Sequence, residues 1–389
     1  MDLEWIAEDS NNTLGHISRM RIEGKPISSP HHALTSKDYE IVERVARSRE
    51  LKNNNIVVNG EILSYSNFKG VGTDTEITNN LFNKMGSRIV KDKVNIVHIR
   101  IPENYVVGDS VIPVNKVSEL KTSALVGIQI EAKASVIIPP INTGISSIEV
   151  FKTIYDRTKI EIQSSKYNKE LGGYIPSTNQ LDLVPEMIQK YLKDGVRIFF
   201  VDFSGSSMNR ALIRTVVSSI RAILRTKKKR IEDPDKQYYL HVLDIASSRK
   251  STMPVTSITD ILTHSYGVDS TSGVMWGGGK LEKNKLRYFN MKDYGAYRIG
   301  GLPKYVLIDP NLTEGSVQAV YEKLRADRLI EYNKECSEVS SRISGNSGNH
   351  NDYGSYLTTK TGADKDVINA LSDIKEIKAN SKRTTLFST

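Results

Sequence analysis

The sequence is poor in cysteine and in long apolar runs. Its 389 residues include one cysteine, Cys336, which excludes an intrachain disulfide and a zinc site built from several thiolates. No apolar run approaches the length of a membrane span, and the first residues have neither the basic nor the apolar region of a secretory signal. We therefore expect a soluble cytoplasmic protein that does not associate with a membrane.

Several short catalytic motifs are missing as well. No Gly-x-Gly-x-x-Gly opens a helix and no Walker loop occurs, so the usual nucleotide-binding signatures are absent. The Gly-x-Ser-x-Gly spacing of a serine nucleophile and the His-x-x-x-His spacing of a metal site are also absent. His98 and His241 lie in apolar runs, where a core histidine is the usual outcome, and His31 and His32 follow a proline in an expected loop. We expect no bound metal.

The composition is that of a globular domain with a basic surface. Hydrophobic residues make up 38% of the chain, which is enough for one large core or two ordinary ones. The chain has 54 Lys and Arg against 45 Asp and Glu, giving a formal net charge of +9. This balance favours a polyanionic partner such as nucleic acid.

Apolar, β-rich runs alternate with amphipathic helical segments through most of the chain. Such alternation predicts a parallel sheet covered on both faces. We expect an α/β fold with an eight-stranded barrel of the TIM type, and an open doubly wound sheet is the alternative. The expected strands are Val94–Ile101, Ala134–Ile138, Lys159–Gln163, Val196–Phe203, Tyr238–Ile245 and Tyr305–Ile308, and the expected helices are Ser147–Tyr155, Val184–Leu192, Arg210–Leu224 and Thr256–Ser265.

Three regions divide the chain in this interpretation. Residues 1–90 form an extension that caps the barrel, opened by a hairpin over Leu14–Ile27 and containing a helical piece over Lys37–Lys52. Residues 91–312 form the remainder of the barrel. Residues 313–389 form a helical, partly flexible region interrupted by a low-complexity stretch rich in Ser, Gly and Asn.

Polar groups follow four of the apolar runs. Because the carboxyl ends of parallel barrel strands share one mouth, these groups are expected to meet there, and two or three carboxylates at one mouth suit glycosidic chemistry. A phosphate could also be held by the backbone of the Ser204–Gly205 loop. The alternative for each is a helix N-cap or a turn, including an Asx turn at Asp269. The candidates are Asp109, Ser110, Asn142, Asp202, Ser204, Gly205 and Asp269.

A basic run follows one of the expected helices. Lys227, Lys228, Lys229 and Arg230 can neutralise phosphates, which would make binding dependent on salt without reading sequence. A solvated helix end is the alternative, since cations complement the helix dipole there.

Three segments together resemble the tRNA-guanine transglycosylase superfamily, including its relatives that insert 7-deazaguanine bases into DNA. Leu14–Ile17 with Gly24–Pro30 resembles the family's opening hairpin. Ala134–Asn142 is similar in placement to the strand and proline-rich loop after the first active-site motif. Gly267–Ser272 followed by Leu286–Phe289 resembles the Gly-x-Asp-x-x-Asp segment and the next strand, in a form closer to the DNA-modifying branch.

The resemblance implies roles for individual residues. It implies Asp269 as the nucleophile that attacks the sugar C1, or Ser272 if the segment is aligned strictly on its glycine. Asp109 and Ser110 resemble the start of the family's base-recognition motif, and Asn142 stands near an expected loop carboxylate. Asp202 sits where the family has a glycine-rich loop that touches the base. The zinc site of the tRNA-modifying members needs three cysteines and cannot form here.

The resemblance also implies an activity. It is the exchange of guanine in nucleic acid, with DNA favoured over tRNA, for a 7-deazaguanine base through a covalent bond between Asp269 and the sugar. This chemistry needs no cofactor, and a homodimer or a partner subunit is compatible with it. One alternative is a catalytically inactive barrel that binds nucleic acid or an active transglycosylase subunit. Another is an unrelated barrel enzyme that acts on a phosphorylated small molecule at the Ser204–Ser207 loop.

Overall fold

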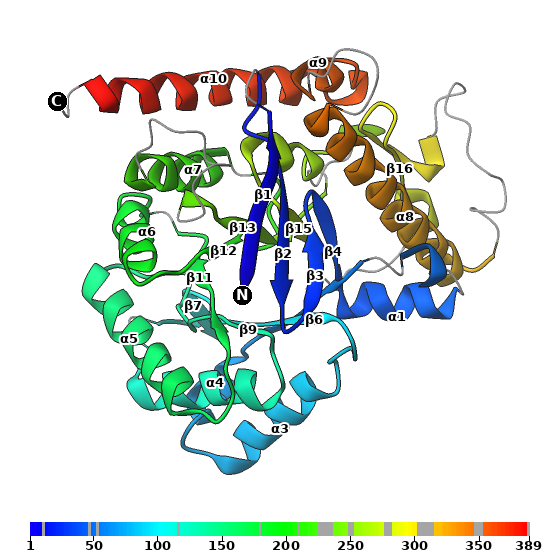
Figure 1. The fold of residues 1–389 in the computed structure, drawn as a ribbon. Coiled ribbons are helices and arrows are strands. Elements are labelled where there is room, and N and C mark those ends of the chain that lie inside the picture. Colours follow the sequence, from blue (N-terminus) through cyan, green and yellow to red (C-terminus); the bar gives the residue numbers. More distant parts are fainter. Residues whose placement is uncertain are drawn as a thin grey trace.

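The central feature of the computed structural model is a parallel sheet of nine strands that nearly closes into a barrel (Figure 1). The structure describes residues 1–9, 12–45, 48–51, 54–114, 117–178, 180–208, 210–224, 236–247, 253–275, 282–301, 315–345 and 353–386. In spatial order the strands are β10 (Glu170–Leu171), β9 (Val136–Ile137), β6 (Val94–Arg100), β5 (Ile56–Ile62), β4 (His31–Thr35), β15 (Ser270–Gly273), β13 (Tyr239–Ile245), β12 (Ile198–Asp202) and β11 (Gly173–Ile175). The expected α/β fold with a barrel-like parallel sheet is confirmed.

The two end strands of this order are neighbours in the chain. Only Gly172 separates β10, which pairs with β9, from β11, which pairs with β12. A Cβ atom on Gly172 would lie 2.5 Å from the ring of Phe200 and 3.1 Å from Val136. A glycine is therefore needed at the point where this segment passes from one edge of the sheet to the other.

Helices flank the sheet on its outer side (Figure 1). Phe199 of β12 contacts Tyr191 at a ring distance of 6.1 Å, and Tyr191 packs edge-on against Tyr155 at 5.0 Å, which joins the sheet to two of these helices. The flanking helices are α1 (Ser36–Arg44), α3 (Thr75–Gly86), α4 (Glu119–Glu131), α5 (Ile148–Ser164), α6 (Leu183–Lys193), α7 (Arg210–Leu224) and α8 (Val317–Ser344). Shorter or more peripheral helices are α2 (Tyr65–Gly70), α9 (Tyr353–Thr358) and α10 (Asp364–Leu386).

An antiparallel sheet formed by β1 (Asp2–Glu8), β2 (His16–Ile22) and β3 (Lys25–Ser28) covers the amino end of the barrel. Trp5 stacks on His16 with 3.8 Å between ring centroids, and its indole N–H donates to the carbonyl of Tyr238, just before β13. The expected hairpin is thus present. The boundary expected at residue 90 is wrong, because β4, which begins at His31, and β5, which begins at Ile56, already belong to the barrel-like sheet.

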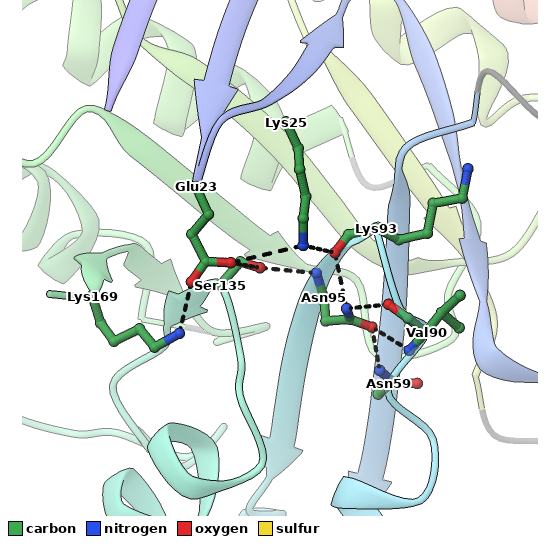
Figure 2. Close-up of polar contacts among 8 residues, drawn as sticks. All are labelled: Glu23, Lys25, Asn59, Val90, Lys93, Asn95, Ser135 and Lys169. Atoms are coloured by element: carbon green, nitrogen blue, oxygen red, sulfur yellow. Dashed lines mark hydrogen bonds and ion pairs between the residues drawn. The ribbon is translucent and has the colours of Figure 1, made fainter. Parts of the chain in front are cut away.

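The turn between β2 and β3 is fixed to the same end of the barrel (Figure 2). The carboxylate of Glu23 accepts hydrogen bonds from Lys169 Nζ at 2.7 Å and from Ser135 Oγ at 2.9 Å. Lys25 Nζ donates to the carbonyl oxygen of Lys93 at 2.7 Å. These contacts connect the turn to the segments that lead into β6, β9 and β10.

Two further antiparallel elements follow the carboxyl ends of barrel strands. The hairpin of β7 (Asn104–Val107) and β8 (Ser110–Pro113) comes after β6. A small sheet of β14 (Val255–Ser257), β17 (Gly295–Arg298) and β16 (Arg287–Asn290) comes after β13 and β15. Within the described residues, no helix has the length and apolar character needed to cross a membrane.

Candidate functional site

Three charged side chains meet at the carboxyl end of the barrel. Arg100 is the last residue of β6, Asp202 is the last residue of β12, and Asp244 lies near the end of β13. The Nε of Arg100 is 3.3 Å from Oδ2 of Asp202, and its Nη1 is 3.0 Å from Oδ2 of Asp244. The side chains are 9%, 0% and 1% exposed, so one guanidinium pairs with two carboxylates away from bulk water.

Asp202 has further polar partners. The hydroxyl of Tyr174, on β11, donates to Oδ2 at 2.8 Å, and the backbone N–H of Ser204 donates to Oδ1 at 2.7 Å. Burial, together with the adjacent carboxylate of Asp202, raises the pKa of Tyr174 well above its usual range. Tyr174 therefore remains a hydrogen-bond donor at physiological pH, and the carboxylate of Asp202 is held in one orientation.

Asp244 is the titratable group of the cluster. Burial raises its pKa to about 7, against the opposing effects of a hydrogen bond from the backbone N–H of Met275 at 2.9 Å and of Arg100. The negative charge of Asp202 adds to the increase. At neutral pH the carboxyl group is thus divided between its protonated and ionised forms, which is the property that general acid–base catalysis requires.

The loop after β12 borders this cluster. Ser204 and Gly205 have φ of +55° and +73°, and Asp244 itself has φ of +55°. The N–H of Gly205 donates to the carbonyl of Asp244 at 2.7 Å, which holds the loop against β13. Ser204 Oγ is buried and has no hydrogen-bond partner among the described residues. Non-glycine residues at positive φ often mark functional sites, since the surrounding structure must hold them there.

Asp269 is not at this end of the barrel, contrary to the expectation from sequence. It precedes β15, its backbone N–H donates to the carbonyl of Leu240, and its Oδ2 accepts from the N–H of Leu240 at 2.8 Å, near the start of β13. Its Oδ1 lies 2.9 Å from His16 Nε2 and accepts from Ser18 Oγ at 2.6 Å. The residue is 1% exposed and fixes the β1–β3 sheet to the amino end.

The reason for this correction is local. The apolar run before Asp269 forms a 3-10 helix over Ile261–Tyr266, and Gly267, with φ of +82°, then turns the chain. The strand begins only at Ser270, in a segment with no apolar residue. Asp269 therefore starts a strand instead of ending one. Asp202 and Asp269 lie at opposite ends of the parallel sheet, so the predicted meeting of Asp109, Asp202 and Asp269 is wrong.

Asp109 and Ser110 are also placed differently from the expectation. Val107 pairs with Ser110, so Gly108 and Asp109 form the two-residue turn of the β7–β8 hairpin, with Gly108 at φ of +58°. Both Asp109 and Ser110 are exposed to solvent. In the part of the chain that the structure describes, neither contacts Arg100, Asp202 or Asp244, which together we call the Arg100 cluster. The short apolar run before Asp109 is a hairpin strand, because the barrel strand has already ended at Arg100.

Of the remaining candidates, Asn142 and Ser272 are buried in the fold, and the basic run is not described by the structure. Asn142 follows β9 and is fully buried, and its Nδ2 donates to the carbonyl of Val114 at 2.8 Å, which is a structural contact. Ser272 lies inside β15, with its Oγ 3.3 Å from Nε2 of His241. Burial lowers the pKa of His241 to about 3, so the imidazole is neutral. The basic run Lys227, Lys228, Lys229 and Arg230 lies outside the described residues.

The sequence interpretation therefore identified Asp202, Ser204 and Gly205 at the carboxyl end and missed Arg100, Tyr174 and Asp244. Arg100 and Asp244 have the signal that identified Asp202, namely a charged residue at the end of an apolar run. No group of three or more potential metal ligands occurs in the part of the chain that the structure describes.

Neither a protein-family model nor a curated protein matches this chain.

Proposed function

We propose that the protein is a (β/α)8 barrel enzyme, with β10 and β11 as one strand interrupted at Gly172, and that it exchanges guanine in nucleic acid for a 7-deazaguanine base. The observation that carries the proposal is the pair of buried carboxylates, Asp202 and Asp244, on the single guanidinium of Arg100. Glycosidic chemistry uses a pair of carboxyl groups, one of which exchanges protons, and Asp244 supplies such a group with a pKa of about 7.

In the proposed reaction the two carboxyl groups have separate roles. An oxygen of Asp202 forms a bond to the sugar C1 as the bond from C1 to the guanine nitrogen breaks, and Asp244 gives its proton to the departing base. The incoming base then loses a proton to Asp244 and displaces Asp202 from C1. Asp202 replaces Asp269 in this scheme, because Asp269 lies at the amino end of the barrel, opposite the Arg100 cluster, where it contacts Ser18 and Leu240.

Two other features support this assignment. Arg100 and Tyr174 hold the carboxylate of Asp202 in position, and Ser204 Oγ is a polar atom at the same loop with no partner among the described residues. The target nucleotide must be extruded from its stack to reach a site at the ends of the barrel strands.

DNA is favoured over tRNA because the one cysteine, Cys336, cannot build the several-thiolate zinc site of the tRNA-modifying enzymes that the sequence resembles.

A second function is favoured by the burial of the same cluster. Asp202 and Asp244 are almost wholly buried, and both are engaged by Arg100. Such pairing also suits a catalytically inactive barrel that binds nucleic acid or an active transglycosylase subunit.

One experiment separates the two functions. The wild-type protein and the variants Asp202→Asn, Asp244→Asn and Asp109→Asn are incubated with guanine-labelled DNA or tRNA and a 7-deazaguanine, and base exchange and denaturant-resistant adducts are measured. The enzyme proposal predicts exchange by wild type and by the Asp109→Asn control, and loss of exchange in the other two variants. Nucleic-acid binding without exchange or adduct by wild type would contradict it and support the inactive barrel.

A further inference from the structure

A pocket of about 210 Å³ lies between β16 and the first half of α8. Three arginines from two elements converge on it, together with aromatic and aliphatic side chains. We call it the arginine pocket. It is lined by Leu286, Arg287, Phe289, Tyr321, Leu324, Arg325 and Arg328.

Two of the three arginines are held by the protein. Arg287 donates from Nη1 to the carbonyl of Ala296 at 2.8 Å and from Nη2 to the carbonyl of Met253 at 3.0 Å. The Nε of Arg325 donates at 2.6 Å to Oδ1 of Asp38, whose carboxylate is almost fully buried. These contacts fix the direction of both guanidinium groups before any ligand arrives.

Arg328 differs from both. Its guanidinium carbon lies 5.0 Å from the centre of the Phe289 ring, so it is stacked on an aromatic face. Within the described residues it forms no ion pair, and its Nε is buried without a hydrogen-bond partner. An arginine stacked on an aromatic ring retains its planar fork of donors, which matches the oxygens of a phosphate.

The size of the pocket limits what enters it. Sites for whole cofactors or drug-sized ligands usually have volumes of roughly 300 to 1,000 Å³. A pocket of about 210 Å³ is below that range and suits one anionic group of a larger ligand.

The arginine pocket lies near the same end of the barrel as the Arg100 cluster. Arg325 pairs with Asp38, which is in the first turn of α1, and α1 begins directly after β4 ends at Thr35. The pocket is therefore beside the carboxyl end of β4, whereas Arg100, Asp202 and Asp244 lie at the carboxyl ends of β6, β12 and β13. A nucleic-acid strand whose target nucleotide enters the mouth of the barrel would place its neighbouring phosphates across this end of the barrel.

We propose that the arginine pocket binds a backbone phosphate of nucleic acid, with Arg328 as its principal contact. The identity of the ligand rests on the proposed function, whereas the presence of an anion site rests on the arginines themselves.

The test measures binding and not catalysis. Affinity for a fluorescein-labelled DNA duplex and for the corresponding single strand is determined by anisotropy as a function of salt, for wild type, Arg328→Gln and Arg328→Lys. The matched control is Arg342→Gln, because Arg342 is on the same helix but pairs with Glu338, far along α8 from the pocket. Thermal unfolding verifies that each variant is folded.

Loss of one phosphate contact should reduce the slope of log K against log salt by about 0.9, which weakens binding about eightfold at 0.1 M salt. We expect this for Arg328→Gln and not for Arg342→Gln. Arg328→Lys should keep the slope and bind a few-fold more weakly, because it retains the charge and loses the fork; this arm remains informative if Arg328→Gln does not fold. Unchanged affinity and slope in the Arg328 variants would overturn the inference even if base exchange is observed. A changed slope without exchange would support it while the proposed function fails.

Discussion

Lowering the pH from 8 to 5.5 is expected to remove about 5 kcal/mol from the free energy of unfolding. The cause is a set of buried histidines that remain neutral in the fold. Burial lowers the pKa of each one from 6.5 to about 3 or 4. Between these pKa values the histidines are protonated in the unfolded chain and neutral in the folded chain. The residues are His31, His32, His98, His241 and His264.

The magnitude follows from these pKa values. At pH 5.5 each histidine favours the unfolded chain by one to two kcal/mol, or about 7 kcal/mol for the five together. Asp244 acts in the opposite direction, because its raised pKa of about 7 means that the folded form takes up a proton first as the pH falls. That uptake stabilises the fold by about 2 kcal/mol at pH 5.5, which leaves the net loss of about 5. The free energy of unfolding of a natural protein is roughly 5 to 15 kcal/mol in total, so acid should unfold this one readily.

The assay is urea unfolding followed by tryptophan fluorescence at several pH values, since Trp5 is buried and stacked on His16. Near pH 5.5 the free energy of unfolding should fall with a slope that corresponds to uptake of roughly three to four protons. The stability contributed by the neutral histidines is fully present above pH 6.5 and is lost as the pH decreases toward 4. A free energy of unfolding that stays constant from pH 8 to pH 5.5 would refute the reasoning.

Two further predictions concern stability. Asp269→Asn should cost about 3 kcal/mol, because an amide nitrogen replaces one of the two buried carboxylate oxygens that accept from Ser18 Oγ and the N–H of Leu240; equilibrium unfolding measures this, and a wild-type midpoint would contradict the structural role of Asp269. Gly172→Ala should cost roughly 1 to 3 kcal/mol, because the added Cβ would lie 2.5 Å from the Phe200 ring; a thermal midpoint equal to that of wild type would mean that the closing segment has more room than described.

Much of the fold could be predicted where the apolar pattern was strong. The strands expected over Val196–Phe203 and Tyr238–Ile245 correspond to β12 and β13, and the helix expected over Arg210–Leu224 has the observed bounds of α7. The strand expected over Lys159–Gln163 is wrong, because this alternating segment is the last part of α5. Ile160 is 53% exposed there, so the alternation arises from helix residues that face solvent and not from a half-buried strand.

The site was harder to predict than the fold. Asp202 was found because it ends a continuous apolar run, whereas Asp269 was misplaced because β15 has the polar sequence Ser-Thr-Ser-Gly and gives no strand signal. The pairing of Arg100 with Asp244 joins positions 144 residues apart. Such a contact depends on how the strands are arranged around the barrel, and no local pattern specifies that arrangement.

The most direct test of the central claim, that the Arg100 cluster carries out glycosidic chemistry, is the pH dependence of a single turnover. Release of labelled guanine from DNA is measured between pH 6.5 and 9, where the protein is expected to remain folded. If Asp244 gives its proton to the departing base, the rate should fall about tenfold per pH unit above pH 7, and Asp244→Asn should abolish release. A rate that is independent of pH across this range, or Asp244→Asn that releases guanine as wild type does, would contradict the account.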